Sequence, residues 1–232
     1  MQWNPDILAK FVAPGIADFT YADIPDISEQ FPQSPHWVVN HFLNNALRAS
    51  FKDGWRQVVL GYLRRTHNAF VYYHEARSRT FSYLDGNNPH NPRVGRFYDA
   101  VSTWENFALQ VSMALDLFRW LNQGEGAFKK NDGTKEQRLY DIANCVKHTA
   151  GKVDSGQCGP SDTVPLWLTN HGFSSFGLHV TYREAANVLS DLSKLAEEYQ
   201  DPHSMREKIL RDREMQSNNS LERTGQRWGQ VL

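Results

Sequence analysis

The hydrophobic residues of this chain recur every three or four positions over several long stretches, which is the spacing of amphipathic helices. One stripe covers 38–51 and follows Ser34-Pro35, where serine is a favourable N-cap and proline suits the first helical position. Asp53-Gly54 interrupts it, and a second stripe continues from Trp55 to Leu84. The second stripe predicts a helix roughly 45 Å long, at about 1.5 Å per residue.

Three more stripes follow in the second half of the chain. They cover 93–121, 138–148 and 181–199, and each predicts a helix. The last two follow Thr134-Lys-Glu-Gln137 and Thr181-Tyr-Arg-Glu184, which have the form of a capping box. Both of those helices therefore have a defined start.

Two short segments between these helices have a strand-like composition. They cover 164–169 and 177–181 and flank a turn near His171-Gly172, which predicts a small hairpin. The predicted fold is therefore all-α, an antiparallel bundle of about five helices with a small β-hairpin-like insertion. Its predicted core comprises Val38, Phe42, Val59, Phe70, Trp104, Val111, Ile142, Val188 and Leu192.

The composition changes at both ends of the chain. Residues 1–34 are rich in proline and predict an irregular arm with one short helix from Pro5 to Phe11. Residues 35–200 form the predicted bundle, with a Gly/Ser-rich loop over 151–162. Residues 201–232 predict a charged helix and a flexible tail.

Charge and cysteine content restrict the classes of function. The 232 residues carry a formal net charge of −1, so any nucleic-acid contact must come from a local basic patch. Only Cys145 and Cys158 are present, which indicates no disulfide framework and a reduced, cytoplasmic setting. We expect no signal peptide, because the first residues lack a basic start and an apolar run. We expect no membrane span, because no apolar run approaches about 18 residues.

Candidate chemistry is concentrated on the predicted helix over 138–148. Asn144, Lys147 and His148 lie mostly off its apolar face, so a helix presents an amide, an ammonium and an imidazole together. Such a set suits an anion-binding or proton-transfer site. The same residues also suit an ordinary polar face, because a cation such as His148 is favourable near a helix C-terminus.

This segment, placed after two long helices, resembles the HEPN superfamily of helical proteins. The family motif is an Arg, four to six residues and a His, often Arg-Asn-x-x-x-His, and Ala143-Asn-Cys-Val-Lys-His148 aligns with it. Pro165-Leu-Trp-Leu-Thr-Asn170 and the helix after Thr181 also resemble a bacterial HEPN-like subgroup. The resemblance implies a homodimer that binds RNA or a protein partner such as an antitoxin, in a toxin-antitoxin or defence system.

The chain departs from the family motif at the arginine. The resemblance implies a metal-independent endoribonuclease in which Arg stabilises transition-state charge while His148 moves a proton, with no cofactor. Ala143 occupies the Arg position, and Lys147 is a flexible point charge rather than a bidentate fork. The resemblance therefore implies binding of RNA or a protein partner, with catalysis left open.

Two alternatives belong to other classes of function. The first is a non-enzymatic protein-interaction module that docks a partner through its charged C-terminal segment. The second is a metal-dependent helical-bundle enzyme using His41, His67 and His74, with Glu75 and Glu105 as further candidate ligands. The chain lacks a Glu-x-x-His motif, so polar histidines without a metal are the simpler interpretation.

The predicted homodimer leads to a direct measurement. Sedimentation equilibrium at micromolar concentration should give a species near twice the chain mass of 26.7 kDa. A strictly monomeric protein would contradict this prediction.

Overall fold

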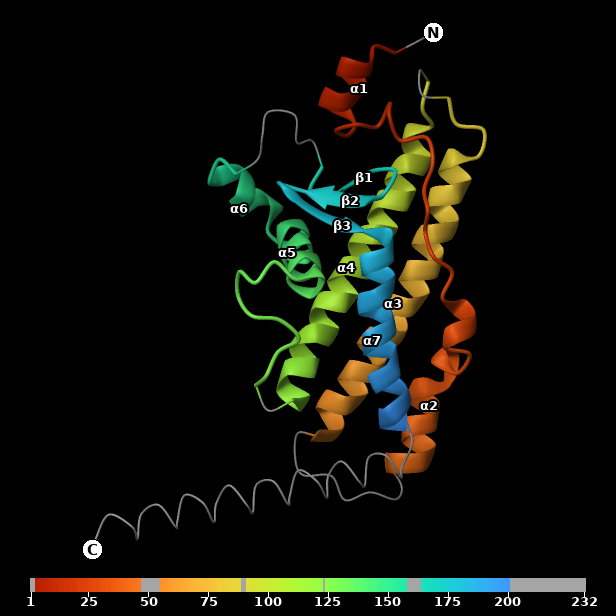
Figure 1. Ribbon diagram of the computed structural model, residues 1–232, viewed down its shortest axis with the longest axis vertical. Helices are drawn as coiled ribbons and strands as arrows, with labels where there is room; N and C mark the ends of the chain where they lie inside the picture. Colours follow the sequence, from red (N-terminus) through yellow and green to blue (C-terminus); the bar gives the residue numbers. More distant parts are fainter. Residues whose placement is uncertain (1–2, 47–54, 89–90, 123, 158–163, 201–232) are drawn as a thin grey trace, which may run out of the picture.

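Two long antiparallel helices form the centre of the molecule. The computed structural model describes residues 3–46, 55–88, 91–122, 124–157 and 164–200. Helices α3 (Trp55–Leu84) and α4 (Val94–Leu121) pack along their lengths, α5 (Lys135–Lys147) lies on α4, and α7 (Tyr182–Gln200) lies on α3 (Figure 1). The predicted helical bundle is therefore confirmed in its main features.

Trp104 on α4 joins several elements in the core. Its side chain is fully buried, and its Nε1 donates a hydrogen bond of 3.0 Å to Thr80 Oγ1 on α3. Its ring lies 5.1 Å from that of Phe173 in the sheet and 5.2 Å from that of Tyr182 at the start of α7. Because its one polar atom is paired, the indole contributes its large apolar area without a desolvation penalty.

The β element is larger than the predicted hairpin. It is a three-stranded antiparallel sheet in the order β1 (Trp167–Leu168), β2 (Gly172–Ser175), β3 (Leu178–Thr181), with Phe173 paired to Val180. The predicted turn exists, because Thr169 Oγ1 accepts from Gly172 N at 3.1 Å. The residues after that turn, Gly172–Ser175, form strand β2, which pairs with β1 on one side and with β3 on the other.

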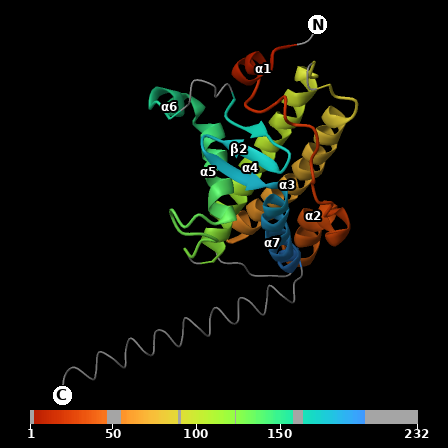
Figure 2. The ribbon, with the colours of Figure 1, turned by 45° about the horizontal axis from the view of Figure 1, so that its top comes forward.

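Gly172 allows the close approach of β2 and β3. A Cβ atom at this position would lie 2.0 Å from the carbonyl oxygen of Val180, a distance that no side chain tolerates. The sheet packs against α5 and the start of α7, and Figure 2 shows it beside α5.

The N-terminal arm lies along the bundle and enters its core. Helix α1 (Pro5–Phe11) forms as predicted, with Asn4 as its N-cap. Asn170, after β1, fastens the arm: its Oδ1 accepts from Thr20 N at 3.0 Å and its Nδ2 donates to Asp18 O at 3.1 Å. The arm contributes these buried apolar residues: Leu8, Val12, Ala13, Ile16, Phe19, Ile24, Ile27 and Phe31.

The helix predicted after Ser34-Pro35 is not a single regular α-helix over its described residues, 34–46. A 3₁₀ turn (Ser34–His36) leads into α2 (Trp37–His41) and then into a π-helical turn (Phe42–Ala46), and residues 47–54 lie outside the described part. The prediction that Phe42 is buried is wrong, since 57% of it is exposed. Trp37 and His41 occupy the inward face, so Phe42 turns outward.

Most of the predicted core is correct. Val38 is only partly buried, and the remaining predicted core positions are buried: Val59, Phe70, Trp104, Val111, Ile142, Val188 and Leu192. The structure confirms that their stripes face the interior.

One predicted loop contains a helix. Helix α6 (Thr149–Asp154) occupies the start of the 151–162 segment, and 158–163, with Cys158, lies outside the described residues. Cys145 is a buried free thiol. The predicted C-terminal helix also lies outside the described residues.

Among the helices that the structure describes, none is long and apolar enough to cross a membrane.

The packing of Trp104 predicts a large loss of stability on truncation. Trp104→Ala should lower the free energy of unfolding by about 3–5 kcal/mol, because a large cavity opens among four elements. Trp120→Ala is the matched control, since 47% of Trp120 is exposed, and should cost much less. Urea unfolding of both variants measures the difference, and equal losses would contradict the assigned core.

Candidate functional site

Helix α5 is held at its start by a modified capping box. Thr134 Oγ1 accepts from Gln137 N at 3.3 Å, as predicted, but Gln137 Oε1 accepts from Gly133 N at 2.7 Å rather than from Thr134 N. Asp132 accepts from Thr134 N instead, at 3.0 Å. With its start fixed, α5 buries Leu139, Ile142 and Ala143 and leaves its opposite side to solvent.

The three predicted site residues lie near the end of α5 and differ in their surroundings. Asn144 is half-buried and lines a hollow beside the sheet. Lys147 Nζ donates to Ser112 Oγ on α4 at 3.1 Å, while the rest of its side chain is exposed. His148 is exposed at the C-cap position, where its backbone N donates to Asn144 O at 3.0 Å.

Arg138 is engaged elsewhere and does not approach His148. Its NH1 donates to His179 O on β3 at 2.7 Å, and its NH2 pairs with Glu184 Oε1 on α7 at 2.5 Å. It thereby ties the start of α5 to the sheet and to α7. Ala143, at the family's arginine position, is fully buried in the core.

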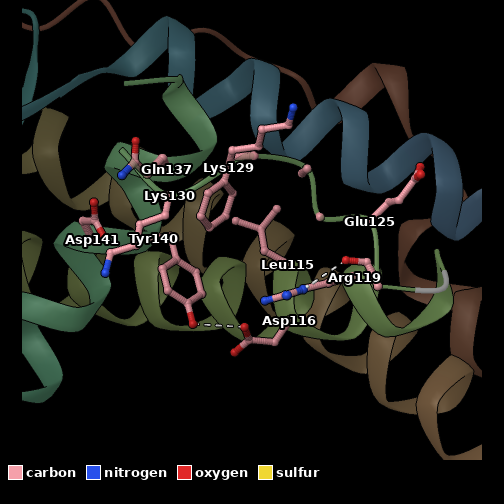
Figure 3. A pocket seen from close by; sticks show the side chains of 13 residues that line it. Leu115, Asp116, Arg119, Glu125, Lys129, Lys130, Gln137, Tyr140 and Asp141 are labelled. Carbon is pink, nitrogen blue, oxygen red and sulfur yellow. Dashed lines mark hydrogen bonds between the residues drawn. The ribbon is translucent and has the colours of Figure 1, made fainter. Parts of the chain in front are cut away.

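One hollow lies along the first half of α5. We call it the loop hollow; it has a volume of about 830 Å³ and lies between α4, the connecting loop and α5. Figure 3 shows the Tyr140 hydroxyl bonded to Asp116, at 3.0 Å. The loop hollow is lined by Leu115, Asp116, Arg119, Gly124, Glu125, Gly126, Ala127, Phe128, Lys129, Lys130, Gln137, Tyr140 and Asp141.

A second hollow lies along the other half of α5. We call it the turn hollow; it has a volume of about 580 Å³ and reaches the turn between β2 and β3. It is lined by Asp141, Asn144, Cys145, Lys152, Gln157, Phe176 and Leu178. Asp141 lines both hollows, so the polar side of α5 carries two adjoining concave surfaces.

Lysines border both hollows. Lys129 and Lys130 line the loop hollow, and Lys152 lines the turn hollow, where its Nζ donates to Gln157 Oε1 at 2.7 Å. Within the described part of the chain, none of the three is within ion-pair distance of a carboxylate. Burial raises the pKa of Asp141, although Lys152 and a hydrogen bond from Gln137 oppose the rise.

The three histidines of the metal alternative are held apart by different partners. His41 Nδ1 lies 3.1 Å from Tyr199 O, His67 Nδ1 lies 2.9 Å from Ser34 O, and His74 packs on the ring of Phe70. Burial lowers the pKa of both His41 and His74. No group of three His, Cys, Asp or Glu suited to a metal occurs among the described residues, so these histidines do not form the metal site.

Three of the five arginines of α3 are occupied within the chain, whereas Arg56 and Arg64 are exposed. Arg77 pairs with Asp26 at 3.1 Å, Arg79 pairs with Glu75 at 2.7 Å, and Arg65 donates to Gln110 at 3.1 Å. Arg77 fastens the arm and Arg65 the neighbouring helix α4, whereas Arg79 pairs within α3 itself. The lysines beside α5 line hollows, which Arg56 and Arg64 do not, and they are for that reason the better candidates for binding an anionic partner.

Comparisons with known proteins found nothing similar to this chain. A scan against protein-family models, a search of curated proteins and a search of solved structures each returned no match. The resemblance to HEPN proteins thus stays an expectation based on the residues of α5.

The sequence did not single out Lys152 or Phe176 as site residues. Lys152 was assigned to a loop, but α6 places it beside α5. Phe176 has no periodic signal, and the one local indication was the glycine that follows it in the turn. Both are brought to the site by the tertiary fold and not by a local sequence pattern.

The burial of Ala143 predicts the outcome of restoring the family motif. Ala143→Arg should lower the free energy of unfolding by roughly 3 kcal/mol or more, because it buries a charge without a partner. Ala150→Arg is the matched control; Ala150 is exposed on α6, and its change should stay within about 0.5 kcal/mol. Thermal unfolding and an RNA cleavage assay check both variants. An Ala143→Arg protein of unchanged stability that cleaves RNA would contradict this assignment.

Proposed function

We propose that this protein binds RNA along the polar side of α5 without cleaving it. The observation that carries the proposal is the pair of adjoining hollows on α5, bordered by Lys129, Lys130 and Lys152. Lysines placed along a concave surface bind a phosphate backbone by neutralising phosphates and releasing counterions. The net charge of the chain is −1, so the attraction must come locally from these lysines, which share the two hollows with the carboxylates of Asp116, Glu125 and Asp141.

The surroundings of the motif support binding rather than catalysis. Cleavage of RNA needs a donor that stabilises the charge on phosphorus beside a group that moves a proton. Ala143 is buried and provides no such donor, and Arg138 is paired with Glu184 on α7. His148, Asn144 and Lys147 then act as contacts to the RNA, with His148 exposed at the end of α5.

Salt dependence tests the lysine contacts. Single-stranded RNA binding, followed by fluorescence anisotropy, should weaken linearly on a log–log plot against salt. The double variant Lys129→Ala/Lys130→Ala should bind more weakly and reduce the slope by about 1.4, because each lost phosphate contact removes about 0.7. Lys10→Ala, on α1, is the matched control and should change neither value.

Two results would contradict the proposal. The first is absence of RNA binding by the wild-type protein at about 50 mM salt, where electrostatic binding is strong; a protein partner would then be the better assignment. The second is cleavage of RNA by the wild-type protein that His148→Ala abolishes, which would make His148 catalytic.

A further inference from the structure

An aromatic residue occupies an unfavourable backbone position at the edge of the turn hollow. Ser175 pairs with Leu178, so Phe176 and Gly177 form a two-residue turn between β2 and β3. Both have positive φ, +40° for Phe176 and +83° for Gly177. Positive φ is common for glycine and tolerated by asparagine, but it is strained for a bulky side chain. The usual sequence for such a turn is Asn-Gly, so the choice of Phe requires an explanation.

The position of the ring suggests one. Phe176 is half-buried and lines the turn hollow, where Asn144, Asp141 and Lys152 also lie. Strained residues are retained where their side chain has a task. A phenyl ring facing a hollow with an amide, a carboxylate and an ammonium provides one apolar flat surface and three polar groups.

We infer that the turn hollow binds an unpaired base of single-stranded RNA, stacked on Phe176; this inference rests on the proposed function. The amide of Asn144 both donates and accepts hydrogen bonds, and the Asp141 carboxylate accepts from an exocyclic amino group. Lys152 lies at the same hollow and contacts the adjoining phosphate. The ligand is therefore a base with an amino group, such as adenine, in a single strand.

The size of the hollow agrees with this ligand. Its volume of about 580 Å³ is within the range of small-molecule sites, which is roughly 300–1,000 Å³. A base within a duplex has its faces covered by its neighbours and cannot stack on a protein ring, so the site discriminates against double strands.

Phe176→Asn is the decisive variant, because it separates strain from binding. Asparagine suits the positive φ, so the melting temperature should rise by about 2–4 °C. Affinity for an eight-nucleotide oligoadenylate should fall roughly 5- to 150-fold, the usual effect of losing one stacked base. Phe176→Tyr keeps the ring and should retain binding. Phe11→Asn, which changes an exposed aromatic residue on α1, is the matched control.

The salt dependence of the lost RNA affinity distinguishes a stacking contact from a phosphate contact. Phe176→Asn should leave the salt slope unchanged, because no phosphate contact is removed, whereas Lys152→Ala should reduce it by about 0.7. A 2-aminopurine base in the oligonucleotide should be quenched by the wild-type protein and by Phe176→Tyr, but not by Phe176→Asn. Binding to an RNA duplex should be the same for all Phe176 variants.

The outcomes separate this inference from the proposed function. If the wild-type protein binds oligoadenylate and Phe176→Asn binds equally well, the stacking site is overturned and the lysine surface stands. If the wild-type protein binds no RNA, both are overturned. A lower melting temperature for Phe176→Asn would show that Phe176 serves packing, which also overturns the inference.

Discussion

The carboxylate of Glu184 joins three elements, and the geometry of the candidate site depends on it. One oxygen, Oε2, accepts from the backbone N and the hydroxyl of Thr181, at 3.0 and 3.1 Å, and so completes the capping box that begins α7. The other, Oε1, pairs with Arg138 of α5 at 2.5 Å. Arg138 in turn donates to His179 O on β3. Helix α5, the sheet and α7 are thus connected through one charged group.

This connection is stable because each hydrogen bond favours the charged carboxylate. Burial alone raises the pKa of Glu184, but the hydrogen bonds from Thr181 and Arg138 outweigh it, and the pKa is lowered overall. Because the pKa of Glu184 is lower in the folded state than in the unfolded state, the ionised carboxylate stabilises the fold at pH values above the unfolded-state pKa. This contribution is lost as the pH falls through the folded-state pKa. At neutral pH the connection is therefore complete, and the turn after β2 lies at a fixed place beside Asn144.

The sequence predicted the elements whose signals are local. The stripe over 55–84 and the capping boxes at Thr134 and Thr181 place α3, α5 and α7, because periodicity and end groups act within a few residues. Phe42 was misplaced because its burial depends on which face of a short helix meets α7. Strand β2 was missed because its pairing is decided by Thr169 and the close approach at Gly172, both tertiary effects.

The candidate site was predictable only in part for the same reason. Asn144 was found because its place on the polar face of α5 follows from helix periodicity. Lys152 and Phe176 reach the turn hollow from α6 and from the sheet, which are separated from Asn144 by the folding of the chain. The Arg138–Glu184 pair holds the sheet, and with it Phe176, beside α5, whereas Lys152 is placed by α6, which directly follows α5. The same pair occupies the arginine nearest the family motif. Since one guanidinium cannot both anchor the sheet and stabilise a reacting phosphate, the contact that holds the sheet beside α5 also argues against Arg138 as a catalytic group there.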